Sequence, residues 1–73
     1  MRKKIMVKMA RGGYMTVVAE GDVRSGYDSY DGPWIDIEVD LYWPHGGQIA
    51  EKNIADWSQV QETFYEAVVA DDR

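Results

Sequence analysis

The chain contains no cysteine, and it has only one histidine, one phenylalanine and two prolines. Without cysteine, neither a disulfide nor a thiolate metal site can reinforce the fold. His45 alone cannot form a histidine-rich metal cluster. Apolar packing must therefore stabilise the chain, whose 73 residues bury only about 60% of the unfolded surface on folding.

Long apolar runs are also missing. No segment approaches the ~20 apolar residues that a helix needs to cross a bilayer. The basic start MRKKIMVKMARGG has a short apolar stretch that Lys8 interrupts, whereas a secretory signal requires a longer uninterrupted one. We therefore expect a soluble, cytoplasmic protein that does not contact membranes.

Charge is distributed unevenly along the chain. Residues 1–24 carry six basic and two acidic side chains, and residues 25–73 carry two basic and eleven acidic ones, so +4 and −9 add to the net −5. Net acidity argues against nonspecific nucleic-acid binding as the main activity. The basic first segment, with Arg2, Lys3, Lys4, Lys8 and Arg11, keeps direct nucleic-acid binding as an alternative.

Alternating apolar and polar residues predict three strands, over residues 3–10, 14–23 and 34–43. Gly12 and Gly13 predict a tight hairpin between the first two strands. Gly21 predicts a bulge or the end of the second strand. Residues 24–33 (RSGYDSYDGP) are predicted to form a loop, because glycine, proline and serine are typical of turns.

The C-terminal third has a different period. Apolar residues three and four positions apart predict an amphipathic helix over about 56–70, with either Ser58 or Asp56 as its N-cap. We therefore predict one small α+β domain over residues 1–73, a three-stranded antiparallel sheet followed by one helix (βββα). The helix is expected to cover the apolar face of the third strand, which comprises Ile35, Ile37, Val39 and Leu41.

The opposite face of the third strand has three carboxylates between two aromatic side chains. Its members are Trp34, Asp36, Glu38, Asp40 and Tyr42, and Tyr27 and Tyr30 precede them in the predicted loop. Interfaces favour Trp and Tyr, and alternate carboxylates about 6.8 Å apart resemble a row of phosphates. These residues predict a non-enzymatic protein-binding module, an inhibitor or regulator that docks on a basic nucleic-acid-processing partner.

Two chemical alternatives have less support. Residues 27–38 match an EF-hand loop at Ser29, Asp31, Gly32 and Glu38, but Tyr27 stands where the first carboxylate is required. Paired carboxylates also serve hydrolases, but such a site needs a concave pocket that an open sheet does not provide. We expect no catalytic residue, no metal and no cofactor.

The sequence leaves the order of the strands open. If the first strand lies beside the third, Lys4 and Lys8 neutralise the acids, whereas in a meander Thr16, Val18 and Glu20 face them. A further alternative is that the exposed aromatic side chains form a homo-oligomer, such as a homo-dimer. Small acidic domains without cysteine are common among accessory proteins of bacteriophages, which is an association of composition only.

Overall fold

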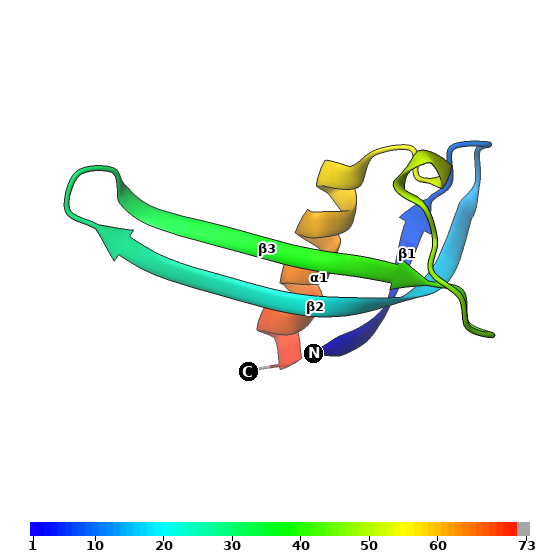
Figure 1. Cartoon of the computed structure of the whole chain (residues 1–73), viewed down its shortest axis with the longest axis horizontal. Coiled ribbons are helices and arrows are strands. Elements are labelled where there is room, and N and C mark those ends of the chain that lie inside the picture. Colours follow the sequence, from blue (N-terminus) through cyan, green and yellow to red (C-terminus); the bar gives the residue numbers. More distant parts are fainter. Residues whose placement is uncertain (72–73) are drawn as a thin grey trace.

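The computed structural model describes residues 1–71. Its strands are β1 (Arg2–Lys8), β2 (Tyr14–Asp28) and β3 (Gly32–Tyr42), and they are followed by a 3-10 turn, η1 (Glu51–Asn53), and a helix, α1 (Trp57–Asp71). The strands form an antiparallel sheet in the order β1-β2-β3 (Figure 1). The predicted α+β fold of order βββα is confirmed.

The β1–β2 hairpin closes at the predicted glycine turn. The Met9 N–H donates to the Gly13 carbonyl at 3.0 Å, and the Gly12 N–H donates to the Met9 carbonyl at 2.9 Å. Gly12 and Gly13 have φ values of +99° and +76°, in the left-handed region that favours glycine. The strand β1 ends at Lys8, two residues before the predicted end, because residues 10–12 form this turn.

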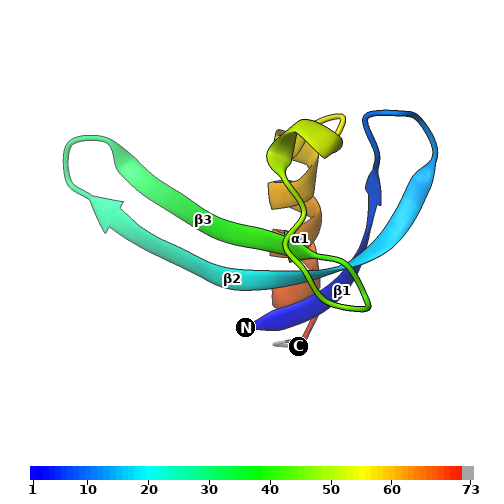
Figure 2. The same cartoon turned by 45° about the vertical axis from the view of Figure 1, so that its right-hand side comes forward.

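β2 and β3 form a hairpin much longer than the sequence predicts. The two strands pair from Val18–Tyr42 to Asp28–Gly32, and the molecule measures 42 Å along its longest axis but 24 and 18 Å across. The far end of this hairpin projects beyond the helix (Figures 1 and 2). We call residues 24–36 the arm and residues 28–32 its tip.

The predicted loop over residues 24–33 is therefore wrong. Only residues 29–31 lie in the turn, while β2 continues to Asp28 and β3 begins at Gly32. Gly26 is tolerated in the strand because the Trp34 indole lies across it, 2.6 Å from where a Cβ would be. Pro33 is tolerated because odd-numbered residues of β3, such as Leu41 and Trp43, direct their backbone groups away from β2.

The prediction that Gly21 marks a bulge or a strand end is also wrong. Gly21 pairs with Val39 within a continuous ladder. A Cβ at this position would lie 1.8 Å from the Glu38 carbonyl oxygen. Glycine is required here because the two backbones approach more closely than any side chain allows.

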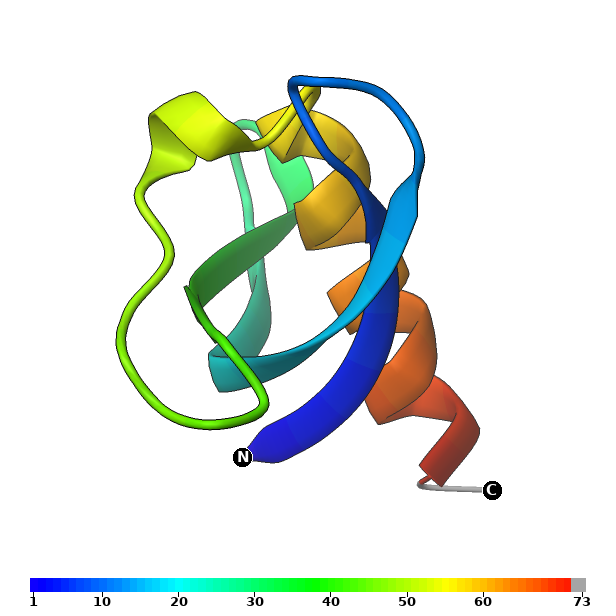
Figure 3. The same ribbon diagram turned by 90° about the vertical axis from the view of Figure 1, so that its right-hand side faces the viewer.

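The core lies between the sheet and α1, which packs chiefly against β1 (Figure 3). The core consists of buried apolar side chains from all four elements and the loop before α1, namely Ile5, Val7, Val17, Ala19, Val39, Leu41, Ile49, Ile54, Val60, Phe64 and Val68. The four-residue spacing of the three helical members confirms the predicted helix. The Asp56 carboxylate accepts from the Ser58 N–H at 3.0 Å, so Asp56 is the cap of the two predicted.

The helix covers less of β3 than predicted. Val39 and Leu41 are buried, but Ile35 on the same face is 54% exposed. A helix of 15 residues spans only about 22 Å, and α1 packs chiefly against the other edge strand. The arm therefore has no helix over either face.

Candidate protein-binding surface

The face of the sheet opposite α1 brings the predicted β3 residues into one row. Pairing in the β2–β3 ladder places Asp40 opposite Glu20, Glu38 opposite Asp22, and Asp36 opposite Arg24. Residues directly opposite in an antiparallel pair share a face, so β2 adds two carboxylates to the predicted three. We call this set the acidic face, and its members are Glu20, Asp22, Asp36, Glu38 and Asp40.

The strand order separates the acidic face from the lysines of β1. Because β2 lies between β1 and β3, Lys4 pairs with Val18 and Lys8 pairs with Tyr14. The alternative in which these lysines neutralise the acids of β3 is therefore wrong. The meander is present, but of the three β2 residues expected opposite the acids only Glu20 is there. Because the hairpin is longer than predicted, the other two acids of β3 lie opposite Asp22 and Arg24.

The acidic face keeps an excess of negative charge. Arg2 pairs with Glu20 at 3.1 Å and Arg24 pairs with Glu38 at 3.0 Å, and all four side chains are exposed. The Gln48 amide donates to the Asp40 carboxylate at 3.4 Å. Within residues 1–71, neither Asp22 nor Asp36 forms an ion pair. Arg2 and Arg24 thus pair with two of the five carboxylates, Lys4 and Lys8 of β1 lie on the same side of the sheet without an ion pair to them, and two cross-strand pairs have like charges.

We expect the Asp22→Asn variant to be more stable than the wild type. It removes one of two like charges placed directly opposite each other, Asp22 and Glu38, and such pairs cost about 0.2–1 kcal/mol. Urea unfolding at low salt measures the gain in the free energy of unfolding, which should shrink at high salt. Asp31→Asn, the same charge change in the hairpin turn, is the control and should give a smaller gain. Equal stability of Asp22→Asn and the wild type would contradict this interpretation.

The predicted aromatic residues are divided among three places. Trp34 is 45% exposed on the same face as the acids, and Tyr42 is half-buried at the other end of the row. Tyr27 pairs with Pro33, which places it on the opposite face of the arm, and it is 77% exposed. Tyr30 lies in the tip and is 97% exposed. The row and the tip are therefore separate surfaces.

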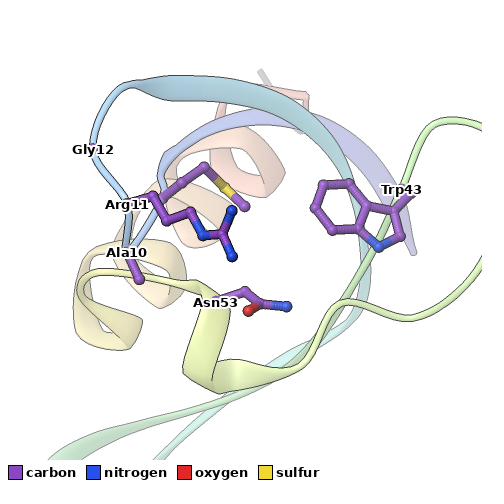
Figure 4. Close-up of a pocket in the computed structure, with 6 residues that line it drawn as sticks. Ala10, Arg11, Gly12, Trp43 and Asn53 are labelled. Atoms are coloured by element: carbon purple, nitrogen blue, oxygen red, sulfur yellow. The ribbon is translucent and has the colours of Figure 1, made fainter.

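A hollow of about 450 Å³ lies at the end of the molecule away from the arm, between the β1–β2 turn, η1 and Trp43 (Figure 4). The residues that line it are Met9, Ala10, Arg11, Gly12, Trp43 and Asn53. The Arg11 guanidinium points into the hollow beside the Asn53 amide, facing the Trp43 indole. Trp43 stacks on His45, with ring centroids 6.3 Å apart and planes 14° apart.

Sequence reasoning missed this hollow and Asp22, and it placed Glu20 opposite the acids of β3 only as one of two alternatives. The hollow combines three segments that are distant along the chain, so no local spacing indicates it. Asp22 joins the face because β2 passes through Gly21 without a break. Alternation continued past that glycine would have found Asp22.

Neither a metal-binding group nor a membrane-spanning helix is found in the part of the chain that the structure describes. Residues 1–71 contain no group of three histidine or carboxylate side chains placed to hold a metal ion. Residues 29–31 of the EF-hand match form a hairpin turn, and Glu38 pairs with Arg24. No helix of residues 1–71 is long and apolar enough to cross a membrane.

The fold and this surface define a small α+β protein with an open antiparallel sheet, of which a helix covers part of one face while the other face is exposed and carries the five carboxylates. No family model, curated protein or solved structure matches the chain.

Proposed function

We propose that the protein is a non-enzymatic binding module that docks its acidic face on a basic protein partner. The partner class with the best matching chemistry is a nucleic-acid-processing protein, whose basic cleft normally holds phosphates. The module would then act as an inhibitor or regulator of that protein. The observation that supports this most is that Asp22 and Asp40 each lie opposite another acid and form no ion pair within residues 1–71.

The like-charged cross-strand pairs of the acidic face cost stability. Glu20 opposite Asp40 and Asp22 opposite Glu38 both reduce the stability of a domain whose stability margin is narrow. Ion pairs with Arg2 and Arg24 compensate only Glu20 and Glu38, and residues that break a rule of local stability are expected at functional sites. A basic partner would convert this repulsion into favourable contacts.

The carboxylates of β2 and β3 are regularly spaced on the acidic face. Successive carboxylates along one strand are about 6.8 Å apart, and neighbouring strands are about 4.8 Å apart. β2 and β3 therefore present two parallel rows of negative charge on a curved surface (Figure 2). Two charged rows with such a spacing suit a cleft that accommodates a nucleic-acid backbone.

Two aromatic side chains, Trp34 and Tyr42, flank the acids of β3. Charges mainly raise the rate of association, whereas buried aromatic contacts mainly slow dissociation. Trp34 is held in place by its contact with Gly26, so little conformational entropy is lost when it binds. The row thus combines electrostatic steering with an ordered aromatic anchor.

Direct nucleic-acid binding through β1 has less support. Arg2 pairs with Glu20 and Lys3 pairs with Asp71, so two of the five basic residues expected to contact phosphates are already engaged. We therefore retain it only as an outcome of the test below.

The test compares two triple variants that remove the same charge from different surfaces. Asp36→Asn/Glu38→Gln/Asp40→Asn neutralises the β3 part of the acidic face, and Glu51→Gln/Glu62→Gln/Glu66→Gln neutralises acids of η1 and α1. Each is immobilised with the wild type and exposed to lysate of the native host at low and moderate salt. We expect the wild type and the η1/α1 variant to retain a basic protein that duplex DNA displaces, and the β3 variant to lose it.

With the purified partner, the β3 variant should associate at least tenfold more slowly at low salt and with a flatter salt dependence. Equal retention by the two triple variants would refute docking through the acidic face. Binding of labelled DNA by the wild type itself, weakening steeply with salt, would instead favour the nucleic-acid alternative.

A further inference from the structure

The tip of the arm presents two side chains to solvent from a hydrogen-bonded turn. The Asp28 carboxylate accepts from the backbone N–H of Tyr30 at 2.7 Å and of Asp31 at 3.4 Å, which holds the turn in one conformation. The phenol of Tyr30 is 97% exposed, and the Asp31 side chain beside it is also exposed. Residues 27–34 contain two carboxylates and no basic residue.

The arm near the tip is also apolar enough to favour a partner. Tyr27 is 77% exposed and Ile35 is 54% exposed, and both lie on the α1 side of the sheet in the part of the arm that the helix does not reach. Exposed apolar groups gathered in one place are typical of interaction sites. A projecting hairpin with this composition is suited to insertion into a concave surface.

The hollow at the other end of the molecule has the complementary chemistry. It offers a guanidinium from Arg11, an amide from Asn53 and the apolar surfaces of Met9 and Trp43 (Figure 4). Within residues 1–71, Arg11 forms no ion pair. A tyrosine ring packs favourably on thioether, guanidinium and indole groups, and a guanidinium pairs with a carboxylate. Its volume of about 450 Å³ can contain one tyrosine side chain.

The open edge of β3 is a poorer surface for self-association. Two copies paired antiparallel through this edge would match residues of the same face, because odd-numbered residues direct their backbone groups outward on both strands. The acids at positions 36, 38 and 40 of one copy would then lie opposite those of the other. Like charges that face each other across two strands are destabilising, so electrostatic repulsion disfavours symmetric pairing of two β3 strands.

We propose that the arm tip of one copy docks in the hollow of a second copy. Tyr30 enters the hollow against Met9 and Trp43, and Asp31 pairs with Arg11. The tip and the hollow lie at opposite ends of the molecule (Figures 1 and 2), so the contact is heterologous and each copy keeps one free tip and one free hollow. Successive copies therefore associate head to tail. This assembly does not use the acidic face and stands independently of the proposed function.

The test uses one variant for each half of the contact. Tyr30→Ser removes the aromatic ring of the tip and leaves the hollow intact. Arg11→Glu reverses the charge in the hollow and leaves the tip intact. Both residues are exposed and lie in turns, so both variants should fold as the wild type does. In sedimentation velocity we expect the mean mass of the wild type to rise between micromolar and millimolar concentrations, and each variant to associate at least tenfold more weakly.

The decisive sample is the mixture of the two variants. Tyr30→Ser supplies an intact hollow and Arg11→Glu supplies an intact tip, so the mixture should form one-to-one dimers that cannot extend further. In the labelled Tyr30→Ser protein, addition of unlabelled Arg11→Glu should shift the amide resonances of residues 9–12 and Asn53. Tyr14→Ser, another exposed tyrosine, and the β3 triple variant are the controls and should both assemble like the wild type.

Three results would overturn the proposal. They are a wild type that stays monomeric throughout the range, single variants that assemble as well as the wild type, and a mixture that stays monomeric while the wild type assembles. Loss of assembly in the β3 triple variant alone would instead assign self-association to the acidic face.

Discussion

Replacing Phe64 with alanine should leave the protein largely unfolded at room temperature. Phe64 is fully buried in the middle of α1, between the turns of Val60 and Val68. Truncation of a buried phenylalanine costs about 3–5 kcal/mol, whereas native domains are stable by only about 0.05–0.15 kcal/mol per residue. For 73 residues this is a total of roughly 4–11 kcal/mol. The loss equals the whole free energy of unfolding at the lower end of this range, where a domain of this size is expected to lie.

The measurement is the far-ultraviolet circular dichroism spectrum and the urea unfolding curve. Phe64→Leu keeps most of the buried volume and should retain a cooperative transition at a lower midpoint. Glu66→Ala, two residues away on the exposed side of the helix, should change stability by less than about 0.5 kcal/mol. A cooperative Phe64→Ala protein with nearly the wild-type midpoint would show that α1 does not anchor the sheet.

The second large effect is expected for Gly21→Ala. The added Cβ would lie 1.8 Å from the Glu38 carbonyl oxygen and 2.8 Å from the Val39 Cα. These neighbours are backbone atoms, so the strands must separate and the ladder must distort. Overpacking commonly costs about 1–3 kcal/mol and occasionally more, and we expect a value at or above the upper end.

Urea unfolding gives the cost, and hydrogen exchange of the arm amides locates it. Gly46→Ala is the control, because its Cβ would meet nothing within 4 Å and its φ of +108° costs only the strain of the left-handed region. Gly21→Ala should be the less stable of the two, with faster exchange on β2 and β3 beyond this point. Equal stability of the two variants would contradict the close approach of β2 and β3.

The position of Gly21 also relates the fold to the proposed surface. It lies between Glu20 and Asp22, the two acids that β2 contributes, and opposite the segment between Glu38 and Asp40. A strand that ended at this glycine would lack Asp22 and would leave Asp36 and Glu38 without cross-strand partners. Because β2 and β3 approach closely here, no side chain fits at this position, and the carboxylates of the two strands lie side by side.

Much of the fold was predictable because local periodicity is strong. Ile5 and Val7 alternate with the exposed Lys4, Met6 and Lys8 in β1, and Val60, Phe64 and Val68 recur every four residues in α1, as expected for faces that meet in one core. The length of the β2–β3 hairpin could not be predicted from local periodicity. Gly26 and Pro33 have poor strand propensity, and each is accommodated only by a cross-strand neighbour or an edge position.

The candidate surfaces divide in the same way. The row from Trp34 to Tyr42 follows from alternation in one strand, so sequence reasoning found it. Whether its acids are neutralised depends on which strand lies beside them, and that is a property of the sheet. The hollow around Arg11 depends on η1 approaching the first hairpin turn, where the Ala10 N–H donates to the Asn53 carbonyl at 2.9 Å.

By itself the sequence determined which residues form strands near the core, which form the helix, and which faces are apolar, because these depend on neighbours a few residues apart. Only the tertiary structure decided that β2 separates the lysines of β1 from the acids of β3 and that the β2–β3 hairpin extends beyond the helix. Strand order and hairpin length depend on hydrogen bonds between distant residues, and local propensity contains no information about such partners.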